Sequence, residues 1–371
     1  MNVKKISLYR QEIMGFAILQ VILFHSNIDF KQSTVLALFG IVKETGYLGV
    51  DIFFFLSGFS LTHGWLCQRY KLFHFYKKRF LRIIPSFTII TLFSIICFFL
   101  TAKNNFSLSE AVSRTGIGFM LAKNYDWWFV PAISFCYGMF PFLVKLIQFF
   151  LVGKTYRSYI YLLLLILFFP GFICLTLIVL GKNVLLILFA RVPNFVLGIV
   201  IGLLLSEREI TNRSTHRKVI LKNMEILACI MTIIGLILLK TGVAWMPREF
   251  AFNYGFLWYP FIFLTFPIIL LLVGVFKVLE QTKERRITSL FFKLLSASGG
   301  LSYELFLAHG FLIYSSDVYD RFFDSVRLLS LLNTGRYIEY LLVFAVSFLF
   351  AIALKKSNIL IDNQFQKYKI L

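Results

Sequence analysis

Long apolar segments alternate with short polar segments along most of the chain. Several apolar runs, such as 87–100, 159–180 and 341–354, come close to the ~20 residues that a helix needs to cross a bilayer. The pattern predicts ten membrane-spanning helices, at 12–28, 46–66, 84–101, 127–149, 158–180, 184–205, 222–241, 255–278, 290–314 and 337–354. We therefore expect an all-α, polytopic membrane helix bundle that forms one domain over residues 1–371, with a short tail at about 355–371.

Lysine and arginine residues set the expected orientation. The N-terminus, the alternate loops near 67–83, 145–157, 206–222 and 277–293, and the C-terminal tail hold 26 of the 38 basic residues. Because cytoplasmic segments carry the excess of Lys and Arg, both termini are expected in the cytoplasm. The basic N-terminus is interpreted as the flank of a retained first span, since no small-residue cleavage site follows it.

Composition supports a membrane protein and excludes other classes. Hydrophobic residues make up 59% of the chain and charged residues only 15%. The net charge of +20 lies in short loops, without the basic, aromatic-rich face that would indicate nucleic-acid binding. The five cysteines form no Cys-x-x-Cys pair and mostly lie in apolar runs, so neither a disulfide framework nor a metal site is expected.

Five polar or aromatic residues on separate predicted helices share one depth near the outer face. They are His25, Asp51, Trp128, Arg191 and His309. Ionisable groups in apolar helices cost free energy unless they are paired, hydrated or used, and histidine can carry protons near neutral pH. Each residue also has a structural explanation: a tryptophan at a helix end is an interfacial anchor, and Asp51 and Arg191 can simply pair.

A second cluster lies on the predicted cytoplasmic side, before the third span. Arg79 and Arg82 are three residues apart and share a helix face if that helix begins this early. Topogenic charge explains such a cluster by default. Two guanidinium groups at a membrane surface also suit bidentate binding of a phosphorylated ligand.

Six segments together resemble the acyltransferase-3 family of integral membrane acyltransferases. The most specific of them is Gly49–Phe59, which reads GVDIFFFLSGF. The others are Met14–Ser26, Lys77–Pro85, Trp128 with Tyr137 and Pro141, Arg191–Gly198, and Leu301–Gly310. They occur in the family's order and cover most of the chain.

The resemblance implies a ten-helix fold and transfer of an acyl group, usually acetyl, from cytoplasmic acyl-CoA as co-substrate. The acceptor it implies is a hydroxyl of a cell-surface carbohydrate or a lipid-linked sugar. His25 is the implied catalytic residue, and Arg79 and Arg82 matter for activity, plausibly at the donor. Some relatives append a hydrolase-like domain that completes the transfer, and we do not expect one here. The protein is therefore expected either to finish the transfer itself or to pass the acyl group to a separate extracytoplasmic transferase as partner.

The sequence departs from the family pattern at two places. Many members carry Arg eleven residues before the histidine, where this chain has Met14. The nearest basic residue, Arg10, lies one turn earlier on the same helical stripe, about 22 Å from His25 along the helix. Many members also have Glu in the fourth helix, where this chain has Ile133 and Ser134.

These residues suggest one mechanism. The phosphates of acyl-CoA bind near Arg79 and Arg82, with Arg10 as a further donor-side cation. His25 acts as general base on the acceptor hydroxyl or as a transient acyl carrier, with Asp51 orienting it and His309 as a second candidate base.

Arg191 or a backbone donor at Ser57-Gly58 is the candidate for stabilising the oxyanion. Trp128 is a further candidate for contact with the substrate or the oxyanion.

Two other functions stay open at the sequence level. A transporter or flippase for a lipid-linked saccharide also places charges at mid-membrane, although no inverted repeat is evident. The second of these functions is that of a sensor that kept the fold but has no catalytic activity. The high content of Phe, Ile and Lys is typical of a low-GC bacterium. The expected location is then the plasma membrane, and the expected acceptor is capsule, teichoic acid or wall glycan.

Overall fold

The computed structural model is helical throughout its regular structure. It describes residues 5–25, 40–68, 71–101, 107, 109, 118–119, 127–151, 171–182, 185–210, 214–240, 247, 250–251, 254, 256–281, 286–314 and 335–367. Its principal helices are α1 (Lys5–Leu8), α2 (Arg10–Phe24), α4 (Tyr47–Gln68), α5 (Leu72–Thr101), α8 (Phe129–Leu151), α10 (Leu186–Phe189), α11 (Val192–Ile210), α12 (Ser214–Leu238), α14 (Tyr259–Glu280), α15 (Arg286–Gly300), α16 (Ser302–Tyr314) and α18 (Gly335–Lys367).

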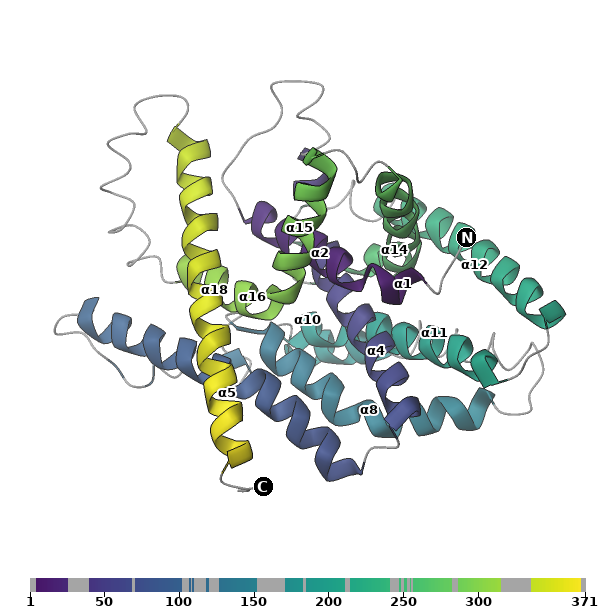
Figure 1. The fold of residues 1–371 in the computed structure, drawn as a ribbon, viewed down its shortest axis with the longest axis horizontal. Coiled ribbons are helices and arrows are strands. Elements are labelled where there is room, and N and C mark those ends of the chain that lie inside the picture. The colour runs from purple at the N-terminus through teal and green to yellow at the C-terminus, as the bar shows by residue number, and fades with distance from the viewer. Residues whose placement is uncertain are drawn as a thin grey trace.

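The helices form a bundle around α2 and α4 (Figure 1). α18 runs along one side and packs on α5 and α16, while α12 and α14 pack together on the other side. Six helices in the described part of the chain are long and apolar enough to cross a membrane. The predicted all-α, polytopic architecture is confirmed. The number of ten spans and the sides of the termini stay predictions, and most of the fifth predicted span (158–170) lies outside the described residues.

Two predicted spans are broken into shorter helices. The chain turns at Ala190 and Arg191 between α10 and α11, and Pro193 then occupies the first turn of α11, where a missing backbone N–H costs nothing. The span predicted at 290–314 divides at Leu301 into α15 and α16. At this second break Lys355 of α18 donates a hydrogen bond of 2.9 Å to the carbonyl oxygen of Gly300, satisfying an acceptor at the end of α15.

Two helices extend well beyond the predicted limits. α5 begins at Leu72, so Arg79 and Arg82 lie within it, three residues apart on one face. α18 continues to Lys367, so most of the predicted tail is helical. At 30 residues α5 is about 45 Å long, more than the ~30 Å of the hydrocarbon core, so its basic end reaches past the apolar layer.

Glycines allow α4 and α11 to pack with their backbones in contact. A Cβ on Gly58 would collide with the carbonyl oxygen of Phe195, and one on Gly198 would collide with that of Phe55. Small residues at such crossings are how membrane helices approach closely. This crossing holds Asp51 of α4 beside the start of α11.

We expect Gly198→Leu to prevent folding, because the clash is with backbone and cannot be relieved by a rotamer change. Overpacking a tight contact typically costs about 1–3 kcal/mol, and a backbone clash costs more. Gly138→Leu in α8 is the matched control, since Gly138 is exposed and a Cβ there meets nothing within 4 Å. Monodisperse yield in detergent is the measurement, and a normal yield of Gly198→Leu would contradict the close crossing.

Candidate active site

Two histidine rings lie next to each other, one at the end of α2 and the other in the middle of α16. His25 follows the last residue of α2, and His309 lies in α16. Their ring centroids are 5.4 Å apart at an interplanar angle of 47°. His25 is exposed, whereas His309 is buried at 2% exposure. The structure thus brings together two of the residues that the sequence placed at one depth.

Backbone carbonyls set the tautomer of both imidazoles. His25 Nδ1 lies 2.9 Å from the carbonyl oxygen of Val21, and His309 Nδ1 lies 2.9 Å from that of Leu305. A carbonyl oxygen can only accept, so each Nδ1 carries the hydrogen. In the neutral ring Nε2 then holds the lone pair, which is the state a general base requires.

A small cavity in the bundle collects the three arginines that the sequence singled out for the donor. It has a volume of about 120 Å³, and its lining includes Arg10, Arg79 and Arg82. Met14 lines the same cavity one turn along α2 from Arg10. Arg10 therefore faces the same space as the position where many relatives have arginine.

A buried carboxylate, that of Glu304, holds one of these arginines. Arg82 donates from Nη1 to Glu304 Oε1 at 2.6 Å and from Nη2 to Oε2 at 3.4 Å. Glu304 is fully buried, and the Arg82 side chain is 41% exposed. The adjacent Tyr303 ring lies under the guanidinium at 5.6 Å, and its hydroxyl donates to the carbonyl oxygen of Ile83 at 2.8 Å. The bidentate pair fixes Arg82 at the boundary between protein and solvent.

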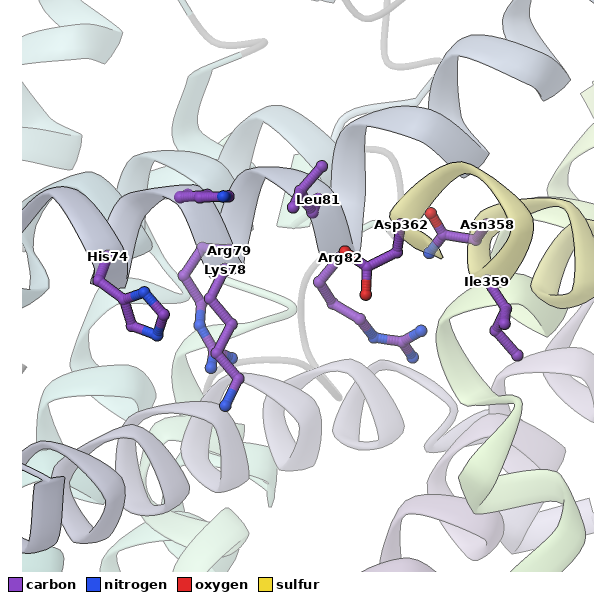
Figure 2. A pocket seen from close by; sticks show the side chains of 9 residues that line it. His74, Lys78, Arg79, Leu81, Arg82, Asn358, Ile359 and Asp362 are labelled. Carbon is purple, nitrogen blue, oxygen red and sulfur yellow. The ribbon is translucent and has the colours of Figure 1, made fainter. Parts of the chain in front are cut away.

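A larger and more open cavity, of about 550 Å³, adjoins the small one. Figure 2 shows its two walls, α5 and α18. Arg79 and Arg82 line both cavities, so the two share a border. The large cavity is lined by His74, Lys77, Lys78, Arg79, Leu81, Arg82, Asn358, Ile359 and Asp362.

Aromatic rings connect the small cavity with the histidine pair. Phe129 of α8 and Phe306 of α16 line its wall, with ring centroids 4.3 Å apart. The Phe306 ring is in turn 5.2 Å from that of His309. Because α2 and α16 both lead from the arginines toward the histidines, the cavities and the imidazoles lie in series along the bundle.

The start of α8 is built on an uncommon backbone conformation. Trp127 has a φ of 58°, which is rare for a bulky side chain, and its side chain is buried. The next two residues supply the ring of Trp128, which faces Arg191, and that of Phe129. Strain of this kind persists where surrounding packing requires a particular geometry.

Asp51 and Arg191 form a separate, fully buried network. Arg191 Nη1 donates to Asp51 Oδ2 at 2.5 Å, and Asn194 Nδ2 donates to Oδ1 at 2.8 Å. The rings of Trp128 and Trp258 lie 5.6 Å from the Arg191 guanidinium carbon. Asp51 thus binds Arg191 and Asn194, while the Nδ1 hydrogen of His25 goes to Val21. These contacts join Asp51 to Arg191 and Asn194, and the role of Asp51 as orienting group for His25 stays a prediction.

Some residues of the site gave little signal in the sequence. Glu304 is separated from Arg82 by 222 positions, so only the fold reveals the pair. Asn194 and Trp258 complete the Arg191 site. Asn194 lies in the family-like segment Arg191–Gly198, whereas Trp258 was not singled out in the sequence. Among the residues that the structure describes, no group of three His, Cys, Asp or Glu side chains is placed to hold a metal ion.

One comparison with known proteins, the one against protein families, gives a match. No curated protein and no solved structure matches the chain. A family model described as an acyltransferase domain matches residues 15–356, a range that contains His25, the arginine pair of α5, Arg191 and His309. With a match over nearly its whole length, the chain belongs to the acyltransferase-3 family.

Proposed function

We propose that the protein moves an acetyl group from cytoplasmic acyl-CoA to a hydroxyl of a cell-surface polysaccharide or a lipid-linked sugar. The observation that carries the proposal is the series of basic cavities, aromatic rings and paired histidines along α2 and α16. Family membership supplies the class of reaction, acyl transfer. The series supplies separate places for a charged donor and a hydroxyl acceptor. The plasma membrane of a bacterium is the proposed location.

The basic cavities suit the donor. Acyl-CoA is too highly charged to enter the apolar layer, so its phosphates would bind where α5 leaves that layer, near Arg79 and Arg82. Three arginines line the small cavity, and the described contacts pair only Arg82 with a carboxylate. The thioester arm would extend through this cavity toward Phe129 and Phe306, which exclude water from the path.

His25 is the proposed general base. Its Nε2 takes the proton of the acceptor hydroxyl, and the oxygen attacks the thioester carbonyl carbon. The carbon–sulfur bond then breaks, the ester forms, and the thiolate leaves with the proton that the imidazolium returns. His309 is a positioning residue in this scheme, since its ring lies against both His25 and Phe306.

A transporter or flippase of a lipid-linked saccharide is the alternative function. Buried charged groups such as Asp51 and Arg191 would suit it. That function gives no role to a histidine pair at the end of a basic cavity. A transporter would move the sugar without consuming a thioester, which makes the two functions separable.

The test uses the full-length protein in vesicles and in cells. Vesicles that contain the protein and the host's surface glycan are given acetyl-CoA labelled in the acetyl group. We expect alkali-labile label on the glycan and release of one free thiol per acetyl group. Transport of glycan with neither event would establish the alternative. A deletion strain complemented with the gene should regain the O-acetyl NMR signal of its glycan.

Arg79→Gln is expected to weaken binding of the acyl-CoA donor and to leave the rate of acyl transfer nearly unchanged. One charge-assisted hydrogen bond to phosphate is worth about 1.5–3 kcal/mol, so the KM for acetyl-CoA should rise at least tenfold with little change in kcat. Lys293→Gln removes an exposed cation of α15 outside both cavities and serves as control. An unchanged KM in Arg79→Gln would place the donor elsewhere.

A further inference from the structure

Two aromatic rings lie beside His25 where α2 ends. The ring of Phe24 meets that of His25 edge to face, with centroids 5.0 Å apart. Tyr47, the first residue of α4, has its ring centroid 4.7 Å from that of Phe24, at an interplanar angle of 56°. Both aromatic residues are partly exposed. They form an accessible aromatic wall next to the proposed general base, and the proposed acyl transfer assigns no role to either ring.

The turn before α4 holds this aromatic wall in place. Gln20, buried at 3% exposure, donates from Nε2 to the carbonyl oxygens of Val42 and Thr45, both at 3.1 Å. These carbonyls lie at the end of a short helix, where such acceptors need partners from outside the helix. A Cβ on Gly46 would collide with the side chain of Phe24, so the chain passes directly against that ring. The fold therefore fixes the place of both rings.

Charged residues place the aromatic wall at the membrane surface. Lys43 and Glu44 precede α4 in the same turn, and Glu44 is exposed. Charged side chains are costly in the hydrocarbon layer, so this turn lies outside it. α4 has 22 residues and is about 33 Å long, enough to cross that layer from its first residue, Tyr47, onward. The wall therefore faces the polar layer or the solvent, where a surface glycan is present and lipid chains are not.

An aromatic wall beside a hydrogen-bonding group suits a sugar ring. The face of an aromatic ring carries partial negative charge, which attracts the weakly positive C–H groups on one face of a sugar. Ligand sites commonly combine aromatic walls with a few polar groups that fix orientation, and Nε2 of His25 is such a group. An open-chain polyol phosphate also has hydroxyls, but it has no ring face to lay on the wall.

We propose that Phe24 and Tyr47 form the acceptor subsite and select acceptors that are built of sugar rings. The sugar lies with a C–H face on the ring of Tyr47, and one of its hydroxyls donates to Nε2 of His25. The inference rests on the proposed function, because it takes His25 as the general base. It narrows the acceptor from a surface hydroxyl in general to that of a ring sugar, with open-chain poly(glycerol phosphate) as the disfavoured class.

The test compares two acceptors and two variants. The full-length protein in phosphatidylcholine nanodiscs receives labelled acetyl-CoA and either the host's sugar-ring polysaccharide or poly(glycerol phosphate), both freed of esters by mild alkali. We expect a KM per repeating unit about tenfold lower for the sugar-ring polymer. Tyr47→Ala should raise that KM about tenfold and leave kcat, the KM for acetyl-CoA and the melting temperature nearly unchanged. Tyr47→Phe keeps the ring and should behave as the wild type.

Phe149→Ala is the matched control. It removes an exposed ring about 30 Å along α8 from Phe129 and should change none of these constants.

Three results would overturn the inference and leave the proposed function intact, provided that the wild type transfers acetyl. They are equal KM values for the two polymers, a loss in Tyr47→Ala that is confined to kcat or absent, and equal losses in Tyr47→Ala and Tyr47→Phe. The last result would show that the hydroxyl of Tyr47, and not its ring, meets the acceptor. Failure of the wild type to transfer acetyl to either polymer would overturn both.

Discussion

Replacing His25 with alanine is expected to lower acyl transfer by about 10²- to 10⁴-fold, the usual contribution of a positioned general base. The physical reason is the loss of the Nε2 lone pair that the hydrogen bond from Nδ1 to Val21 leaves available. Folding should be unaffected, because His25 is exposed. The measurement is acetyl transferred from labelled acetyl-CoA to glycan, together with the melting temperature.

Two further variants show whether the loss is chemical. His63→Ala replaces another exposed histidine, on α4, and should retain full activity. Exogenous imidazole should restore part of the activity of His25→Ala, because the exposed position admits a small base. Full activity of His25→Ala at normal expression would refute the mechanism. A large loss that imidazole does not restore would favour an acyl-carrier role, in which covalent attachment to the protein is required.

His309 tests the positioning role separately. His309→Gln keeps a side-chain amide that can donate to the Leu305 carbonyl, so we expect a smaller loss than in His25→Ala, confined to kcat. Loss equal to that of His25→Ala would make His309 the second reacting group.

The apolar pattern was sufficient for the helical, polytopic architecture but not for the lengths of individual helices. Charged residues at the start of α5 and at the end of α18 shortened the predicted spans, because only apolar residues were assigned to a span. These helices continue since their backbone hydrogen bonds and buried positions, such as Leu354 and Asn358, persist past the membrane layer. The breaks at Arg191 and Leu301 were not predicted, although Pro193 lies beside the first and the pair Gly299-Gly300 beside the second.

Depth in the membrane predicted part of the site. It placed His25, His309, Asp51 and Arg191 at one level, and the structure divides these four into two pairs. Depth in the membrane is only one coordinate, so it does not show which residues of equal depth lie next to each other in the bundle. Glu304, the partner of Arg82, required the whole fold to be found.

Removing one member of the Asp51–Arg191 pair is expected to destabilise the protein strongly. Both side chains are fully buried, so Asp51→Ala leaves a guanidinium without its counter-charge between two tryptophan rings. Breaking a buried pair in this way typically costs about 3–5 kcal/mol. We expect a melting temperature lower by several degrees in detergent, and a similar fall for Arg191→Met.

The double variant Asp51→Leu with Arg191→Met separates a structural role from a chemical one. Replacing both charges with apolar groups of similar size is often neutral in buried sites, so most of the lost stability should return. If the pair only positions α4 and α11, acyl transfer should return with it, whereas Lys293→Met, which removes an exposed cation, should change neither quantity. A double variant that melts normally yet transfers no acyl group would show that Arg191 acts on the reacting groups, because packing and charge balance would then both be intact.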